Sequence, residues 1–356
     1  MILNNKNTIY CCLCAFISFS TYANNMALFG SMNTNITEAS QAFASRSKEQ
    51  GSSIENTTKL GLRGEEAITE NTHLLYKVSF KVYNATQSGD TTPVKASSTY
   101  LGIRNPLLGT LLIGRNNTVF KSTATNMDIF NSTDASLSHL VAGQTRSPDS
   151  INYYSALIDS TFTLNSTYLM AASQDTQSQL NTHNRFAFSA NIGDPHLHSH
   201  AYYSSLSYNQ GISHIDAIRW IGQIKSKNLT FSELAQYTQS EICTEKNMAG
   251  NSYVISLSDT LGKLQFNAEY GEDTSGLGDY FEHATGGSDT DRSTFSNIHV
   301  NQLTLGARYQ LSPSTELYCL DVLYRGHYQN INDQETNKLV TLTNDNIVSI
   351  GIDYHF

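Results

Sequence analysis

Three histidines at alternating positions are the part of the sequence that most resembles a metal-binding cluster. His196, His198 and His200 would share one face of an extended strand, because successive side chains of a strand point to opposite faces. Imidazoles in such a row can bind Zn²⁺ or act as a proton switch. The three also share the phase of Tyr202 and Leu206, which belong to an apolar face. We therefore interpret them as loop residues beside a strand and predict no metal site.

Sequence patterns of the common enzyme sites are missing. The sequence contains no HExxH, no GxSxG, no phosphate-binding loop and no dinucleotide-binding fingerprint. A serine and a histidine could still pair at the rim of a folded domain, but their spacing in the sequence cannot demonstrate such a pair. We therefore predict a protein that is not an enzyme and that needs no cofactor.

The elements that must position any site are alternating strands. The clearest predicted hairpin has apolar residues at every second position of 253–257 and 264–270, with a turn at 259–262. In another strand Lys77 and Lys81 alternate with apolar residues and face away from them. This repeated unit of about ten residues and a turn predicts an all-β fold.

A second hairpin is predicted at residues 303–324, with a Ser-Pro-Ser turn at 312–314. We expect the apolar residues of both its strands on one face and Asp321 on the other. Residues 229–240 break the alternation near Glu233, and we assign no structure to them. The apolar face would contain Leu303, Leu305, Ala307, Tyr309 and Leu311, followed by Tyr318, Leu320, Val322 and Tyr324.

The chain ends in the middle of a strand pattern. Chain ends usually fray, because nothing there offsets the entropy of ordering them. A strand that closes a barrel cannot fray. The alternating apolar residues of this last strand are Val348, Ile350, Ile352, Tyr354 and Phe356.

Composition indicates an exported protein without a nucleic-acid partner. Residues 1–23 resemble a signal peptide, with an apolar core at 9–19 and a cleavage site after Ala23. Charged residues make up 15% of the chain, below the roughly 25% of a typical soluble domain. The net charge of −9 argues against binding nucleic acid, which requires a basic surface. Only Cys243 and Cys319 lie beyond the signal segment, too few for a disulfide scaffold.

Residues 24–356 show no linker and no break in composition, which predicts a single domain. No apolar run approaches the roughly 20 residues of a membrane-spanning helix. Alternating strands occur in soluble sandwiches and in membrane barrels. The export signal, the short turns alternating with long polar loops, and strand lengths of about nine to eleven residues favour the barrel. In a barrel the three histidines would lie above the bilayer.

Four stretches resemble the general-diffusion porins of Gram-negative bacteria. They are T-K-L-G-L-R-G-E at 58–65, the hairpin at 100–116 that ends in Gly-Arg-Asn, R-S-P-D-S-I-N-Y at 146–153, and the final Tyr354–Phe356. The resemblance implies a trimeric barrel of 16 strands with long extracellular loops and a third loop folded into the lumen. It also implies that the last strand pairs with the first, at about Ala27–Ile36, and that the assembly machinery of the outer membrane reads Phe356.

The same resemblance implies a pore constriction. In this family acidic residues of loop three face a ladder of basic residues on the opposite wall, and such charges filter solutes by sign. By position, Lys59, Arg115 and Arg146 would form the ladder, with Asp128 and Asp134 as acidic counterparts. The sequence departs from the family in lacking the Pro-Glu-Phe-Gly-Gly type of turn in loop three.

The sequence therefore predicts an outer-membrane channel for small hydrophilic solutes and ions, embedded in outer-membrane lipid. A barrel enzyme similar to a phospholipase and an adhesin without a channel are the alternatives. A conductance measurement separates them, because only the channel gives current steps in a planar bilayer.

Overall fold

The computed structural model describes residues 26–83, 94–170, 185–245, 247–288, 290–330 and 339–356. The predicted signal segment, 1–23, lies outside these residues. The side chain of Cys243 is also not described, whereas Cys319 is a free, exposed thiol. Among the described residues no helix is long and apolar enough to cross a membrane.

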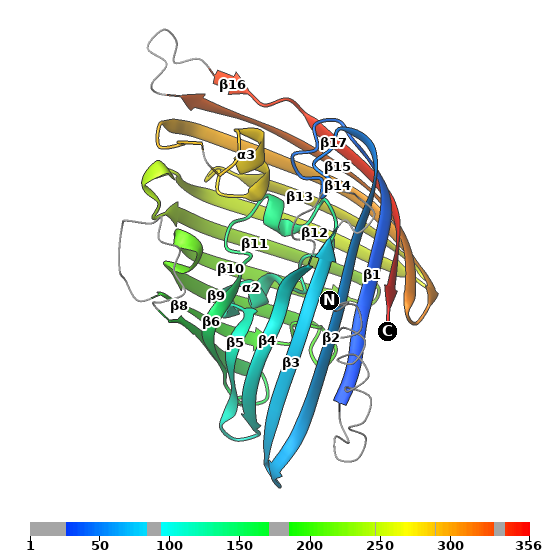
Figure 1. Ribbon diagram of the computed structural model, residues 1–356, viewed down its shortest axis with the longest axis vertical. Coiled ribbons are helices and arrows are strands. Elements are labelled where there is room, and N and C mark those ends of the chain that lie inside the picture. Colours follow the sequence, from blue (N-terminus) through cyan, green and yellow to red (C-terminus); the bar gives the residue numbers. More distant parts are fainter. Residues whose placement is uncertain (1–25, 84–93, 171–184, 246, 289, 331–338) are drawn as a thin grey trace, which may run out of the picture.

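One antiparallel sheet contains all the named strands of the described chain and curls into a closed barrel of 16 strands (Figure 1). An additional short strand, β16 (Leu339–Thr341), pairs only with the far end of β15. The barrel strands are β1 (Met26–Ala39), β2 (Gly51–Thr69), β3 (Thr72–Tyr83), β4 (Val94–Asn105), β5 (Gly109–Asn117), β6 (Arg146–Tyr154), β7 (Phe162–Leu169), β8 (Arg185–Gly193), β9 (Tyr202–Gln210), β10 (Ile215–Ser226), β11 (Leu229–Ser240), β12 (Ala249–Leu261), β13 (Leu264–Asp273), β14 (Phe295–Ser312), β15 (Thr315–Asn330) and β17 (Asp345–His355).

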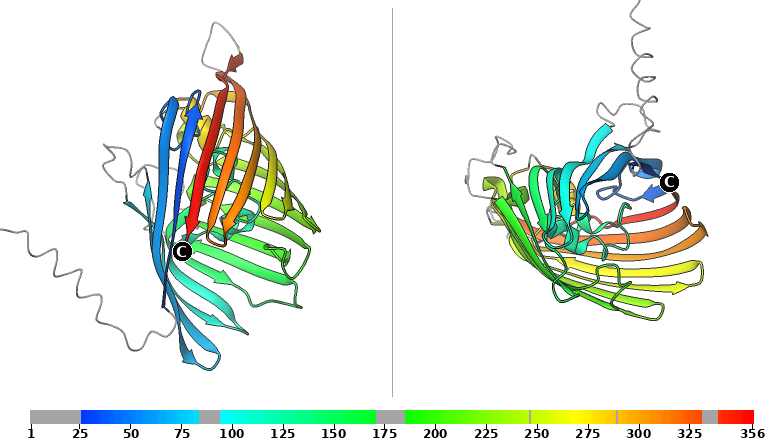
Figure 2. Two further views of the ribbon diagram at one scale, coloured as in Figure 1. Left: turned by 90° about the vertical axis from the view of Figure 1, so that its right-hand side faces the viewer. Right: turned by 90° about the horizontal axis from the view of Figure 1, so that it is seen from below.

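The barrel closes where the last strand meets the first, as predicted. Ile36 of β1 lies opposite Ile350 of β17 in an antiparallel register, and the pairing continues to Ser31 and His355 (Figure 2). Beyond it, Gly30 and Phe356 exchange two backbone hydrogen bonds, 2.9 and 3.0 Å long. Every barrel strand therefore has two neighbours, and the closed sheet leaves no unpaired edge for lipid to cover.

Apolar side chains cover the outside of this barrel, as the alternation predicts. The outward residues of the last strand are exposed, reaching 65% at Ile350, while Ser349 between them is buried. An apolar band on the outer face is the arrangement that a bilayer stabilises. Examples from around the barrel are Leu28, Leu101, Ile113, Phe188, Ile224, Ile255 and Leu305.

The prediction for the second hairpin is correct for β14 and wrong for β15. Asp321 lies opposite the outward residue Leu305 in the strand register and is itself exposed. The four apolar residues of β15 point inward and are buried, because loop three packs against this part of the inner wall. These residues are Tyr318, Leu320, Val322 and Tyr324.

Residues 229–240, to which the sequence analysis assigned no structure, form the regular strand β11. Its alternation is intact, but Glu233 faces outward beside Phe231, and Leu234 faces inward. Leu234 is fully buried, in the same apolar cluster as Leu137 and Leu140 of loop three. An inward position that would be polar in an open lumen is therefore apolar here, because loop three covers it.

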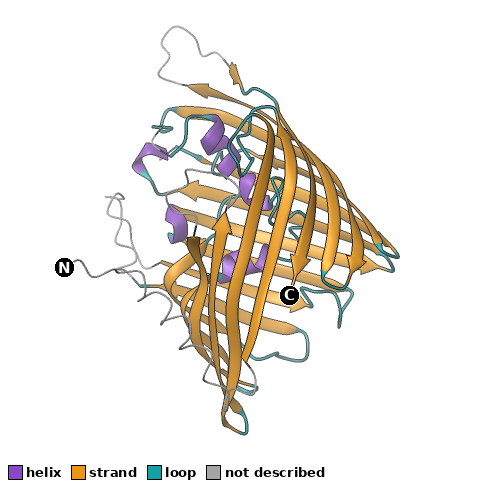
Figure 3. Cartoon of the chain, turned by 45° about the vertical axis from the view of Figure 1, so that its right-hand side comes forward, coloured by secondary structure: helices purple, strands orange, loops and turns teal. Residues whose placement is uncertain are grey.

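Short helices occupy the interior and the rim with long loops (Figure 3). Loop three, residues 118–145, joins β5 to β6 and contains α2 (Val119–Ala124) and the 3-10 turn η2 (Leu137–His139). Thr118 caps α2, because its hydroxyl accepts a hydrogen bond from the backbone N–H of Lys121. Among the described residues, the remaining helical segments lie in other loops: η4 (Ile212–His214), η5 (Cys243–Glu245) and α3 (Asp279–Ala284).

Candidate pore constriction and loop three

Arg219 of β10 holds the two ends of loop three against the inner wall. Its guanidinium donates to the carbonyl oxygens of Phe120 and Ala142, each 3.0 Å away, and to Gln236 Oε1 at 2.6 Å. It also lies 3.9 Å from the centre of the Phe120 ring. Arg219 is completely buried. These contacts fold the loop into the lumen, because they satisfy a buried charge that no water reaches.

The middle of loop three is held by side chains of β14. Arg308 donates to the carbonyl oxygen of Ile129 at 3.0 Å, and Gln302 donates to that of Ala135, also at 3.0 Å. Phe130 lies over Gly306, where the ring occupies the space that a side chain would fill. The glycine therefore allows close contact between the loop and the wall.

Asp134 fixes loop three to the barrel seam and to the first loop. One carboxylate oxygen accepts from Ser349 Oγ at 3.1 Å, and the other lies 3.5 Å from Arg46 Nε. Arg46 is also 3.6 Å from the carboxylate of Glu55. Burial and the neighbouring charge of Glu55 raise the pKa of Asp134. Asp134 has no exposed surface, so it contributes a structural contact and no lumen surface.

The opposite wall of the lumen carries basic side chains on neighbouring strands. Lys81 lies between Lys59 and Lys95 in the strand registers, and Arg63 lies opposite Lys77. We call this set, together with Arg146, the basic wall. Its residues are Lys59 and Arg63 of β2, Lys77 and Lys81 of β3, Lys95 of β4 and Arg146 of β6.

Aromatic rings and one hydroxyl group position the basic wall. The Phe29 ring is 5.6 Å from Lys59 Nζ and 5.2 Å from Lys77 Nζ. The Tyr83 ring lies 5.8 Å from Lys81 Nζ. Cations are attracted to ring faces at such distances, so the rings offset part of the repulsion between like charges. Arg146 donates to Ser97 Oγ at 3.0 Å.

Loop three carries both signs of charge. Asp128 is partly buried and accepts a hydrogen bond from Ser136 Oγ at 3.2 Å. Burial raises the pKa of Asp128 to about 6, against the opposing effect of Lys121 and Arg308. Burial also lowers the pKa of Lys121 to about 8, reinforced by the like charge of Arg146. Lys121 donates to the carbonyl oxygen of Gln144 at 2.9 Å.

The predicted ladder residues lie on the wall opposite the attachment of loop three. Lys59 and Arg146 belong to the basic wall, and Arg115 is partly buried at the end of β5, where its charge repels that of Arg146. The sequence patterns did not point to Arg63 or Lys95, although the inward phase of Lys77 and Lys81 indicated this wall. Lys121, Arg46 and Arg219 were likewise not predicted as functional residues.

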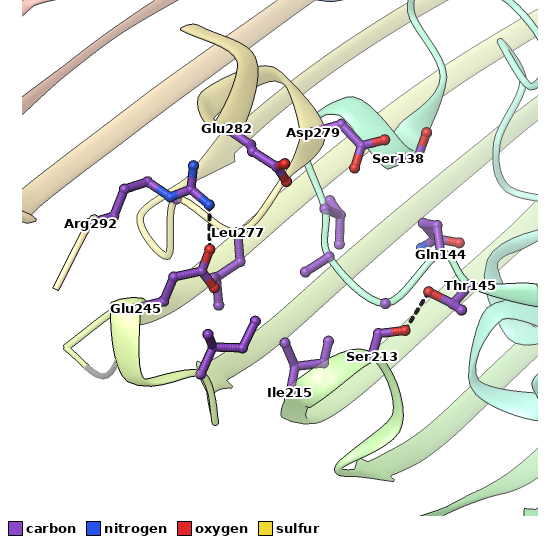
Figure 4. Close-up of a pocket in the computed structure, with 15 residues that line it drawn as sticks. Ser138, Gln144, Thr145, Ser213, Ile215, Glu245, Leu277, Asp279, Glu282 and Arg292 are labelled. Carbon is purple, nitrogen blue, oxygen red and sulfur yellow. Dashed lines mark hydrogen bonds and ion pairs between the residues drawn. The ribbon is translucent and has the colours of Figure 1, made fainter. Parts of the chain in front are cut away.

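A pocket of about 230 Å³ opens between loop three and three other loops at the rim (Figure 4). Arg292 forms an ion pair with Glu245 there, and α3 contributes Asp279 and Glu282. Burial, followed by the like charge of Glu282, raises the pKa of Asp279 to about 6. Ser213 donates to Thr145 at 2.6 Å across the pocket. Acidic groups therefore collect beside loop three, away from the basic wall.

The histidine cluster lies in the turn between β8 and β9, at the rim with short turns, and not above the bilayer as predicted. The Asp194 carboxylate accepts backbone N–H bonds from His196 and His198, both 2.8 Å long, and from Ser199. These bonds lower the pKa of Asp194. The described residues contain no group of three or more side chains able to hold a metal ion.

A closed barrel with an apolar outer band, a charged interior and a loop folded into that interior defines a channel of the outer-membrane type. Comparison with known proteins assigns the chain to such a class. The model of the Gram-negative porin family matches residues 11–319, and the chain belongs to this family. The protein is an outer-membrane channel for passive diffusion. No curated protein matches the chain in sequence.

Solved porin structures share its fold at low sequence identity. The anion-selective porin from Comamonas acidovorans is 15% identical, with a TM-score of 0.70 over 93% of this chain and 99% of that one. OmpF of Salmonella typhi is 11% identical, with a TM-score of 0.65 over 94% and 98%. OmpT of Vibrio cholerae is 13% identical, with a TM-score of 0.59 over 93% and 99%.

Proposed function

We propose that this channel passes anions in preference to cations, and that the basic wall sets this preference. Five positively charged side chains share the adjoining strands β2 to β4, and Arg146 lies on β6 of the same inner wall. A unit charge 10 Å from a passing ion contributes about 0.4 kcal/mol even at the dielectric constant of water. The basic wall is the observation that carries the proposal.

The net charge of −9 does not oppose this preference, because an ion in the lumen responds mainly to charges within about a screening length of its path. Among the acidic groups, Glu55 and Asp134 flank Arg46, and Glu245 pairs with Arg292. The solved porin from Comamonas acidovorans is described as anion-selective, which supports the same property here.

Within the channel, we propose that the narrowest part lies between the basic residues and loop three. Lys59, Arg115 and Arg146 would form one side, and Asp128 the other. Asp134 would act on the pore only indirectly, by holding loop three in place. A field directed across the lumen would then sort small hydrophilic solutes by charge.

The experiment is a reversal-potential measurement under a KCl gradient. We expect Arg115→Gln combined with Arg146→Gln to lower the permeability of anions and raise that of cations, each by about fourfold at low salt, since two charges of about 0.4 kcal/mol are removed. The shift should shrink at 1 M salt, where the screening length is about 3 Å.

The matched control is Lys263→Gln combined with Arg325→Gln, which removes two charges from a short turn and from the outer face of β15. Its reversal potential should stay at the wild-type value. An equal shift in both double variants, or a shift in neither, would contradict the proposed constriction.

We also propose that the chain assembles as a homotrimer. Polar side chains cross the outward face of the first two strands, where Asn56 donates to Thr34 at 2.8 Å and Thr58 donates to Asn56 at 3.1 Å. Polar groups are costly against lipid and are better placed at a protein interface. The solved structure of OmpT of Vibrio cholerae is a trimer form. Native mass spectrometry in detergent tests the number of copies.

We also propose how the chain is exported and assembled. Cleavage after Ala23 would release a single porin domain, residues 24–356, whose Phe356 is read by the assembly machinery before the barrel enters outer-membrane lipid. Mass determination of the mature protein from outer membranes tests the cleavage site. We propose no enzymatic role, cofactor or metal.

A further inference from the structure

A second cavity lies beneath loop three, toward the rim with short turns. Its volume is about 560 Å³, within the range of small-molecule sites. Residues 117–126 cover it from above, strands β7 to β9 form its wall, and the turns 155–160 and 193–200 surround its opening. The α2 helix packs against β8 and β9, and Thr167 Oγ1 accepts the backbone N–H of Val119 at 2.9 Å.

Hydroxyl and amide groups dominate the lining. Asn191 donates to Thr163 Oγ1 at 3.1 Å and accepts from the Tyr203 hydroxyl at 3.3 Å. Asn165 donates to Ser189 Oγ at 3.3 Å. Such a network fixes the orientation of its members. Hydroxyls and amides both donate and accept, so each can bind a further partner of the same kind.

Charge distinguishes this cavity from the rest of the lumen. Its lining contains no lysine or arginine, and Asp194 is its only carboxylate. Backbone N–H groups of the turn already surround that carboxylate. A solute here meets hydroxyl and amide groups that donate and accept, the rings of Tyr154 and Tyr203, and the imidazoles of His196 and His200 at the opening. An ion gains little from these groups, whereas a polyhydroxylated molecule can exchange its bonds to water for bonds to the wall.

We propose that this cavity binds neutral polyhydroxylated solutes of sugar size as they pass through the channel. The basic wall and the neutral cavity would then serve different solutes in one lumen. The cavity proposal rests on the channel function but not on its anion preference. Tyrosine rings offer apolar faces for the C–H surfaces of such solutes, and the hydroxyl and amide groups bind their O–H groups.

The experiment measures single-channel current in a planar bilayer while glucose or maltose is added. We expect a conductance decrease that saturates with sugar concentration and exceeds the change in bulk conductivity. Polyethylene glycol of the same hydrodynamic size should give only a proportional decrease, because its ether oxygens accept hydrogen bonds but do not donate them.

The test variant replaces the hydrogen-bonded pair at the wall, Asn165→Leu with Ser189→Ala. Because the double substitution removes both the donor and the acceptor of this hydrogen bond, it leaves neither group unpaired. The sugar concentration that gives half of the effect should rise about tenfold. The control is Gln223→Leu with Ser232→Ala, a second pair bonded at 3.0 Å on β10 and β11 outside the cavity. It should leave the sugar effect unchanged.

Three outcomes overturn the site: equal, unsaturable effects of sugar and polyethylene glycol on the wild type, an unchanged half-effect concentration in the test variant, or an equal rise in the control. If the test variant fails to fold, Asn126→Ala on loop three replaces it, with the same expected direction. Absence of current steps from the wild type would overturn the channel function itself, a result distinct from steps without a saturable sugar effect.

Discussion

Asp128 of the candidate constriction has a charge that depends strongly on its surroundings. It lies on loop three, where burial raises its pKa to about 6, and where Lys121 and Arg308 act in the opposite direction. An ordinary aspartate would be fully charged at that pH. The charge of loop three therefore changes within a range of pH in which the lysines and arginines of the basic wall keep theirs.

We predict that anion preference falls as pH rises from 5 to 7. Protonated Asp128 leaves the basic wall unopposed, and its ionisation adds a negative charge on the other side of the pore. Reversal potentials at pH 5, 6 and 7 measure this change. The variant Asp128→Asn should lose this part of the pH dependence and should keep, at every pH, the anion preference that the wild type has at pH 5. An unaltered pH profile in the variant would place Asp128 away from the ion path.

The raised pKa of Asp128 also makes the free energy of unfolding depend on pH. The folded chain binds the Asp128 proton more tightly than the unfolded chain, whose aspartates titrate near pH 3.9. This stabilisation is therefore fully present below about pH 4 and is lost as pH rises to about 6.

At the scale of elements, loop three connects two strands but is held in place along its length, because the inner wall contacts it at several points. Arg219 reaches its beginning and its end, Arg308 its middle, and Asp134 the seam between β1 and β17. Each contact supplies a partner to a buried backbone or carboxylate oxygen. The loop should therefore narrow the lumen as a rigid body.

We predict that Arg219→Met loosens loop three. The substitution leaves two buried carbonyl oxygens without their charged donor, at a cost of about 1.5–3 kcal/mol for each bond. Single-channel recordings should show larger and noisier conductance, while the barrel still forms.

Arg219→Lys is the control variant for this position. Lysine keeps the charge but not the planar fork that reaches both carbonyl groups, so its effect should lie between those of arginine and methionine. Conductance and noise at the wild-type level in Arg219→Met would mean that Arg219 does not hold the loop.

At the scale of the whole molecule, the last residue extends the seam that closes the barrel. Phe356 and Gly30 exchange two backbone hydrogen bonds, and the phenyl ring lies over the Gly30 Cα, where any larger residue would collide with it. The ring also stacks on Tyr354, with 5.8 Å between centroids. Phe356 thus completes the seam and presents an aromatic ring at the rim, where a membrane interface favours it.

We predict that deletion of Phe356 lowers the amount of folded protein in the outer membrane several-fold, while export and signal cleavage continue. Folded barrels migrate differently from heated ones in electrophoresis, which gives the measurement. Phe356→Tyr keeps the ring and the backbone bonds and should assemble normally. Wild-type amounts of folded, heat-modifiable protein after the deletion would remove the assembly role.

The sequence by itself determined the strands, their outward faces and the barrel, because alternation with a period of two follows directly from strand geometry. It also determined the pairing of the last strand with the first, through the family resemblance at Phe356. Inward residues were harder to interpret, since their polarity depends on what covers them. Lys77 and Lys81 face the open lumen and are charged.

Only the tertiary structure decided what loop three covers. Tyr318 and Leu234 are apolar and face inward because the loop packs on them, which reversed the prediction for β15 and obscured β11. Asp134 became a buried contact of the seam, and Arg219 a support of the loop, through neighbours far away in the sequence. The alternation of residues along a strand cannot predict such contacts, because they form only when the loop packs inside a closed barrel.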